Sequence, residues 1–159
     1  MSRKVLIAVS LCLAVLVTYQ VNSAEKAKKK LDLKNVKCVL VSKNKAKATA
    51  STDYKGGKVF FCCPNCCKKF ATDKKVRQAN AHKANHQLAQ TGQAKLAKCM
   101  FTGKKLNPAT KIRVAGVDIC FCCNGCKTRV LEAKDQVACA FNDKAFAKGY
   151  TLPKKKSKK

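Results

Sequence analysis

The sequence contains no tryptophan, and aromatic residues make up only 6% of its 159 positions. Large side chains that fill a hydrophobic core are therefore scarce. A small domain with so little core usually needs a metal ion or disulfide bonds to fold stably. Few aromatic rings also leave little for stacking on nucleic-acid bases, which disfavours a protein that binds single-stranded nucleic acid.

Acidic residues are scarce as well. The chain has 8 of them against 35 lysines and arginines, and its formal net charge is +27. Self-repulsion at this level is tolerable when the positive charge is solvated or faces an anionic partner. A solvated surface is the default interpretation, and an anionic membrane surface or envelope polymer is the alternative. The charge would also suit a zinc-containing nucleic-acid-binding protein, but the export predicted below argues against nucleic acid as a partner.

Patterns typical of catalysis are missing. The chain shows no carboxylate pair, no nucleophile–base set and no phosphate-binding loop, so we predict that it is not an enzyme. Cys63-Pro64-Asn65-Cys66 has the two-residue spacing of a redox-active dithiol. The sequence around it lacks the βαβ pattern of a thioredoxin-like protein, and a redox activity is not favoured.

The N-terminus has the pattern of a signal peptide. Residues 2–4 carry positive charge, residues 5–17 are apolar but for one serine, and small residues follow up to Ala24. A membrane-spanning helix needs roughly 20 apolar residues, so this shorter run favours export with cleavage over a membrane anchor. We predict a signal peptide over residues 1–24, which would remove Cys12. The protein is then exported, periplasmic or secreted, with no transmembrane segment after cleavage.

The remainder contains an internal repeat of a cysteine pattern. Cys38 opens the first copy and Cys99 the second, and each copy continues to a cluster, residues 61–66 and 121–126. The copies are offset by 61 residues at the first cysteine and by 60 at the cluster, so one residue was gained or lost between them. The patterns are Cys-x23-Cys-x3-Cys and Cys-x22-Cys-x3-Cys.

These patterns divide the chain. We expect a basic linker over residues 25–36, repeat 1 over 37–92, a short linker over 93–97, repeat 2 over 98–152, and a basic disordered tail over 153–159.

The predicted fold class is α+β, with two small modules that each consist of a β-hairpin followed by a helix. Residues 54–61 form a hairpin with the pair Gly56-Gly57 as its turn, and residues 114–121 repeat it around Gly116. Pro64 suits the first position of a helix that begins within the cluster.

Two further helices are expected, over residues 73–90 and from a cap at Asn142 to Lys148. His82 and His86 lie four apart on the longer one, and therefore on one face. Such a pair can bind metal, but an exposed face is the favoured interpretation because the second copy has no equivalent.

The cysteine spacing has a chemical interpretation. The first cysteine of each x3 pair ends a strand, and the second lies in the first turn of a helix. Free N–H groups and the positive dipole end favour the thiolate there, which is the form that binds metal. The hairpin would bring in the distant Cys38 or Cys99. Three sulfur ligands suit a soft ion, Zn(II) or Cu(I), about one per repeat.

Each copy resembles the YHS/TRASH-type heavy-metal-binding domain, a small treble-clef-like zinc module. The residues that carry the resemblance are Cys38, Tyr54, Gly56, Lys58, Phe61, Cys62, Cys66 and Phe70 in the first copy, and Cys99, Thr102, Gly103, Gly116, Phe121, Cys122 and Cys126 in the second. The resemblance covers residues 37–150 and implies a role in metal sensing, trafficking or resistance. The metal ligands it implies are Cys38, Cys62, Cys66, Cys99, Cys122 and Cys126.

A tetrahedral site needs a fourth ligand, which the sequence does not name. Cys63 and Cys123 are the nearest candidates. Water or an exchangeable thiol would instead leave an open position, which suits metal transfer better than structural holding.

Two other interpretations of the cysteines remain open. The metal can be purely structural, or the chain can be a disulfide-stapled secreted basic protein that binds anionic envelope or membrane surfaces, because exported proteins meet oxidants. The eleven cysteines left after cleavage cannot all pair within one chain. Cys67, Cys120 and Cys139 have no counterpart in the other copy and are expected to be buried thiols.

Overall fold

The computed structural model describes residues 31–152. The predicted signal peptide, residues 25–30 of the expected linker and the basic tail lie outside the described residues. Within the described part, no helix has the length and apolar character needed to span a membrane. In chain order the elements are β1 (Lys47–Tyr54), β2 (Gly57–Phe61), α2 (Pro64–Thr72), α3 (Lys74–Ala79), α4 (Ala81–Gln90), β3 (Lys95–Leu96), β4 (Asn107–Val114), β5 (Val117–Phe121), α5 (Asn124–Leu131), α6 (Gln136–Phe141), α7 (Asp143–Gly149) and β6 (Tyr150–Thr151).

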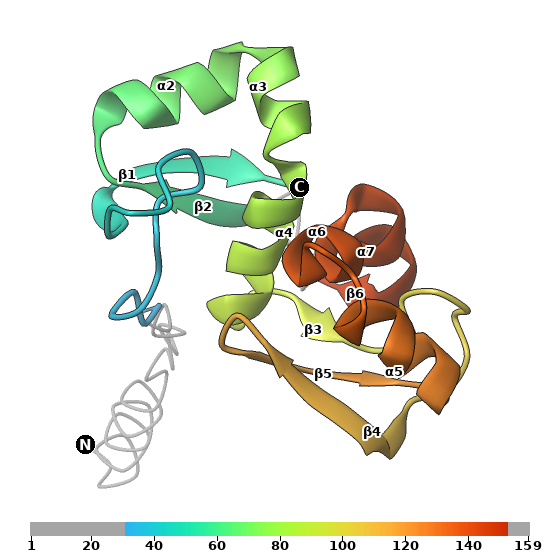
Figure 1. The fold of residues 1–159 in the computed structure, drawn as a ribbon. Helices are drawn as coiled ribbons and strands as arrows, with labels where there is room; N and C mark the ends of the chain where they lie inside the picture. Colours follow the sequence, from blue (N-terminus) through green and yellow to red (C-terminus); the bar gives the residue numbers. More distant parts are fainter. Residues whose placement is uncertain (1–30, 153–159) are drawn as a thin grey trace, which may run out of the picture. The chain divides into compact units, whose positions relative to one another are not determined.

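The predicted α+β fold class is confirmed. Strands β1 and β2 form an antiparallel hairpin that is followed by α2, and strands β4 and β5 form a second hairpin that is followed by α5 (Figure 1). Pro64 occupies the first turn of α2, as expected from its fixed φ and missing N–H. Phe70 and Val130, both buried, hold the two helices on the core.

Both hairpins turn through two residues with positive φ. These are Lys55 (48°) and Gly56 (86°) in the first hairpin, and Ala115 (45°) and Gly116 (86°) in the second. Turns of this kind match the twist of the flanking strands. The expectation that Gly57 shares the first turn is wrong, because Gly57 is the first residue of β2.

Gly57 has a different use. A Cβ atom at this position would lie 2.6 Å from Cδ2 of Leu88 in α4. The missing side chain therefore lets α4 approach the backbone of β2.

The expected helix over residues 73–90 is divided into α3 and α4. Asn80 lies between them with ψ of 13°, and its side chain donates to the Val76 carbonyl. Asp73 caps α3 by accepting from the N–H groups of Lys75 and Val76. The predicted cap at Asn142 is confirmed, because its side chain accepts from the Ala145 N–H at the start of α7.

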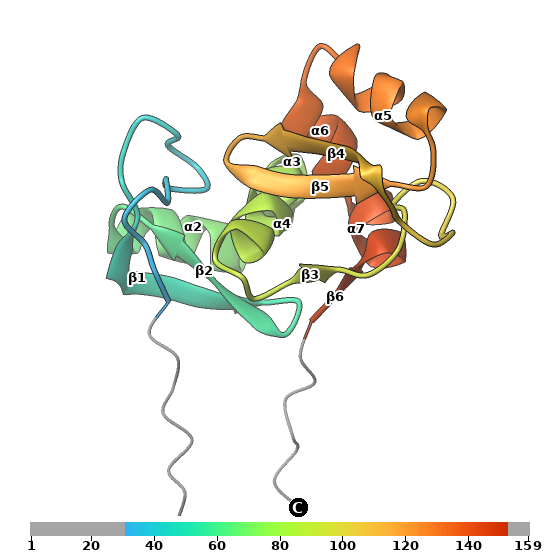
Figure 2. The ribbon, with the colours of Figure 1, turned by 90° about the horizontal axis from the view of Figure 1, so that it is seen from below.

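Helix α4 joins the two copies. It contacts β2 on one side and β5, α6 and α7 on the other (Figure 2). One continuous core contains Phe61 and Phe70 of the first copy, Phe121 and Phe141 of the second, and Leu88 of α4. The copies therefore share their apolar interior.

The segments expected to be linkers carry structure of their own. Strand β3 falls within residues 93–97 and pairs antiparallel with β6 at the end of the second copy. Val36, from the described end of the first expected linker, is buried with Ala46 and Phe60, and Leu31 and Leu33 pack against them. These contacts tie both segments to the folded unit.

Two buried amides fix the position of α4. Gln87 is 2% exposed, and its Oε1 accepts from the Phe60 N–H at 2.6 Å. Its Nε2 donates to the Phe60 carbonyl and to the Lys37 carbonyl, each at 2.9 Å. Gln87 therefore bonds both polar groups of a β2 residue and also holds the residue that precedes Cys38.

Asn85 makes the equivalent link to the second copy. It is fully buried, and its Nδ2 donates to the Phe141 carbonyl at 2.8 Å and to Oδ1 of Asp143 at 2.9 Å. Asp143 also pairs with Lys55 from the first turn, with 2.6 Å between Nζ and Oδ1. The network connects the tip of the first hairpin to α7.

Replacement of Gln87 tests the anchoring of α4. Gln87→Ala leaves three main-chain groups, on Phe60 and Lys37, without their partner. We expect it to lower the free energy of unfolding by about 2–4 kcal/mol, because buried unpaired polar groups are costly. Urea unfolding of the zinc-supplemented, reduced protein measures the effect. Gln78→Ala, at an exposed position of α3, is the matched control, and equal stability of the two variants would contradict this role.

Candidate metal centre

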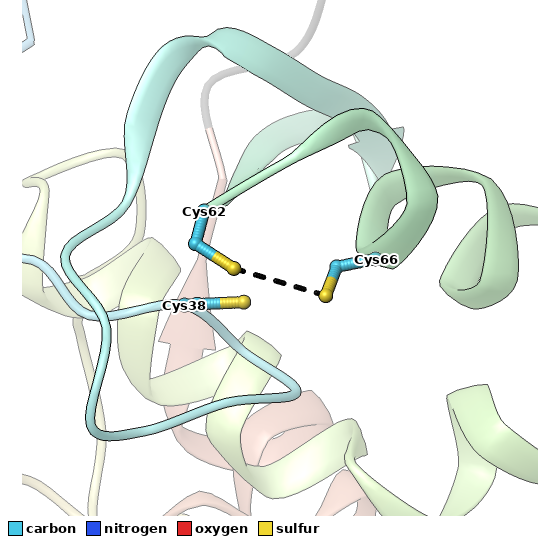
Figure 3. A group of neighbouring side chains, drawn as sticks. All are labelled: Cys38, Cys62 and Cys66. Atoms are coloured by element: carbon cyan, nitrogen blue, oxygen red, sulfur yellow. Dashed lines mark hydrogen bonds between the residues drawn. The ribbon is translucent and has the colours of Figure 1, made fainter.

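The first cysteine triad is assembled by three elements. Cys38 lies in the loop before β1, Cys62 directly follows β2, and Cys66 lies in the first turn of α2. Their sulfur atoms all lie within 4.8 Å of one another, with 3.8 Å between those of Cys62 and Cys66. Figure 3 shows the three side chains pointing toward a common centre. The structure thus brings together the three residues selected in the first copy.

The second triad repeats this arrangement. The sulfur atoms of Cys99, Cys122 and Cys126 also lie within 4.8 Å of one another, and those of Cys122 and Cys126 are 3.8 Å apart. Two such groups, built from equivalent elements of the repeat, can each hold a metal ion.

The sulfur spacing suits a tetrahedral ion. Ligands at about 2.3 Å from a tetrahedral zinc ion lie about 3.8 Å from one another, which is the separation measured in both x3 pairs. Three thiolates this close repel one another in the absence of a cation. An all-sulfur donor set favours soft ions, Zn(II) and Cu(I) among them.

The loop after the first cysteine differs between the copies. The N–H of Cys38 donates to the carbonyl of Asn44, whereas the N–H of Cys99 donates to the carbonyl of Lys104. The loop therefore spans six positions in the first copy and five in the second. This locates the one-residue offset of the repeat between the first cysteine and the hairpin.

The first cysteine of each triad is buried and is also surrounded by hydrogen-bond donors. Burial acts to raise the pKa of Cys99, but hydrogen bonds from the side chain and backbone of Thr102 and from backbone N–H groups outweigh it and lower the pKa to about 6. The pKa of Cys38 is lowered in the same way, against the effect of burial, chiefly by the Val41 N–H. These thiols ionise readily.

The last cysteine of each triad behaves in the opposite way, and the expectation that the helix N-terminus favours its thiolate is wrong because burial and the neighbouring thiols outweigh the helix dipole. Burial and the neighbouring thiols raise the pKa of Cys66 to about 12, and the same causes raise the pKa of Cys126 to about 12. At neutral pH each triad without a cation therefore keeps a proton on its helical cysteine. An incoming ion must displace that proton.

Thr102 is a site residue whose role the sequence did not predict. Its hydroxyl oxygen lies 3.2 Å from the Cys122 sulfur, and the Thr102 residue also hydrogen-bonds to Cys99. In the sequence, its role is indicated only by its position three residues after Cys99. The contact becomes visible only when the loop is folded back onto the cluster.

Cys63 and Cys123 are the N-cap residues of α2 and α5. The Cys123 sulfur is 3.8 Å from that of Cys122, but neither N-cap thiol belongs to the groups whose sulfurs all lie within 4.8 Å. The N–H of Cys66 lowers the pKa of Cys63, and the N–H of Cys126 lowers that of Cys123. Their role as a fourth ligand stays a prediction.

The histidine pair is placed differently from the favoured expectation. His82 and His86 are both half-buried rather than exposed. The Nε2 atom of His86 lies 3.0 Å from the Ala115 carbonyl, and its ring packs edge-on against Phe141 with 5.0 Å between ring centroids. Burial lowers the pKa of His86. Neither histidine belongs to a metal-binding group in the described part of the chain.

The three unmatched cysteines are half-buried. Cys67 and Cys139 pack at the edge of the core. Cys120 alternates with the buried Ile119 and Phe121 and is only partly covered, so its side chain is not enclosed as expected. None of the three belongs to a described triad.

Comparison with known proteins gives no relative: no family model, curated protein or solved structure matches the chain. The resemblance to YHS/TRASH-type domains therefore stays a prediction.

Thiol labelling of zinc-loaded protein tests which cysteines are ligands. We expect iodoacetamide to modify Cys63 and Cys123 rapidly at pH 7, because they lie outside the triads and the helix N-termini favour their thiolates. The six triad cysteines should stay unmodified until a chelator is added. Peptide mass spectrometry measures the sites. Protection of Cys63 and Cys123 by zinc would instead identify them as fourth ligands.

Proposed function

We propose that this protein binds soft metal ions, one in each repeat, and that binding rather than catalysis is its function. The ligands are Cys38, Cys62 and Cys66 in the first site and Cys99, Cys122 and Cys126 in the second, and the ion is Zn(II) or Cu(I). The observation that carries the proposal is the convergence of three sulfurs within 4.8 Å, made twice by equivalent elements.

Exposure of the triads favours metal handling over a purely structural role. Cys62, Cys66, Cys122 and Cys126 are all only half-buried, so an ion held by them would lie near the surface. A soft acceptor can reach such an ion and exchange ligands with it. The resemblance to YHS/TRASH-type domains and the predicted export support a role in metal sensing, storage or delivery outside the cytoplasm.

A disulfide framework is the competing interpretation. All eleven described cysteines are unpaired in the structure, and the 3.8 Å between the sulfurs of Cys62 and Cys66 far exceeds the roughly 2.05 Å of a disulfide bond. The spacing favours a shared cation over a bond between the two sulfurs.

Metal stoichiometry tests the proposal. The reduced protein should bind two equivalents of zinc, and Cys66→Ser and Cys126→Ser should each bind one, because each removes a ligand from a different site. Cys66→Ser should also lower stability in the presence of zinc, since an ion bound only to the folded state stabilises it. Metal analysis after gel filtration measures the bound ion.

The matched control is Cys67→Ser, which should retain both equivalents. Cys67 neighbours Cys66 in α2 but lies outside the triad. Native protein that carries no metal and shows at most one free thiol would contradict the proposal and identify the cysteines as disulfide-bonded.

The affinity for zinc should depend steeply on pH. The raised pKa values of Cys66 and Cys126 keep these thiols protonated at neutral pH, so binding must release protons. Affinity is therefore expected to fall as the pH falls from 8 to 6, by about tenfold per pH unit for each proton displaced. Competition with a chelator, corrected for its own protonation, measures this change. A pH-independent affinity would exclude these thiols as ligands.

A further inference from the structure

A groove opens beside the first triad. Its volume is about 490 Å³, which lies within the range of sites that hold small molecules. It is lined by Lys43, Asn44, Lys45, Lys47, Cys62 and Cys63. One of its walls is therefore a cysteine of the first triad.

The positive charge of the groove favours anionic ligands. Lys43, Lys45 and Lys47 line it together with the neutral Asn44, and no acidic side chain does. All three lysines are exposed, so their ammonium groups are available to a ligand from solvent. Carboxylate groups are the simplest partners for such a set.

The triad supplies the second element of recognition. Three sulfurs leave one position of a tetrahedral ion open, and the thiol of Cys63 lies outside the group that would surround the ion. The groove reaches Cys62, whose thiol hydrogen-bonds to the Asn44 side chain. A ligand that enters along the lysines therefore arrives at the edge of the metal site.

The second copy differs at the equivalent positions. Its loop is one residue shorter, and the Thr102 hydroxyl lies 3.2 Å from the Cys122 sulfur. Asn107, which pairs with Phe121, stands where Lys47 pairs with Phe61 in the first copy. Lys105 stands where Lys45 does, but Asn107 replaces Lys47, so the set of three lysines that lines the groove belongs to the first copy.

We propose that the first metal site takes an anionic thiol of low molecular mass as its fourth ligand, with its carboxylates bound by Lys43, Lys45 and Lys47. The inference rests on the proposed metal-binding function. The incoming thiol gives its proton to solvent, and its sulfur donates an electron pair to the ion in place of a water molecule, with no change in oxidation state. The first site then exchanges its ion through this complex.

Cobalt(II) provides the test, because thiolate-to-cobalt charge-transfer absorption reports the number of sulfur ligands. The reduced full chain is loaded with two equivalents of cobalt and titrated with three probes. Mercaptosuccinate carries a thiol and two carboxylates, succinate carries only the carboxylates, and monothioglycerol carries only the thiol. Native mass spectrometry counts the cobalt ions and probe molecules that remain on the chain.

We expect mercaptosuccinate to raise the charge-transfer absorption with one equivalent per chain while both cobalt ions stay bound. Its apparent Kd should be about tenfold below that of monothioglycerol, as expected for a few exposed ion pairs, and succinate should leave the absorption unchanged. The triple variant Lys43→Gln, Lys45→Gln, Lys47→Gln should remove this advantage. The control variant Lys104→Gln, Lys105→Gln, which changes the second copy's loop, should keep it.

The outcomes separate the two proposals. A chain that binds no cobalt contradicts the metal-binding function itself. If two cobalt ions bind, the present inference is overturned by any of four results: no response to mercaptosuccinate, two equivalents bound with equal affinity, cobalt stripped without a ternary complex, or a triple lysine variant that behaves like the original chain.

Discussion

Helix α4 packs against both hairpins, and the rest of the structure depends on this double contact. Leu88 and Ala84 enter the shared core, and the missing side chain of Gly57 admits the helix to the backbone of β2. Gln87 and Asn85 then convert this contact into a specific one, because a buried amide that is fully bonded in one position is left unpaired in another. The last helix of the first copy therefore packs against β5, α6 and α7 of the second copy.

This arrangement connects the core to the candidate metal sites. The Lys37 carbonyl accepts from Gln87, so α4 holds the backbone next to Cys38. Phe61 and Phe121, both fully buried, precede Cys62 and Cys122 and fix the strand ends from which these thiols project. The triads are therefore positioned by packing before an ion arrives. An ion would add to a preformed arrangement and take the place of the proton on its helical cysteine.

Local patterns in the sequence predicted much of this structure. The hairpins, the start of α2 at Pro64 and the cap at Asn142 follow from turn and capping chemistry that acts over a few residues. The two triads follow from the repeated spacing, because a hairpin returns the chain close to its starting point. The placement of α4 could not be predicted in this way. It depends on contacts between distant residues such as Asn85 and Phe141, for which a single sequence carries no signal.

The pairing of β3 with β6 has a consequence for the path of the chain. Strand β3 lies just before the second copy and β6 lies at its end, and Lys95 pairs with Thr151 and Leu96 with Tyr150. The second copy is therefore closed into a loop whose two ends are hydrogen-bonded to each other. This pairing ties down the last described residues of the fold, and loss of β6 would release the start of the second copy as well as its end.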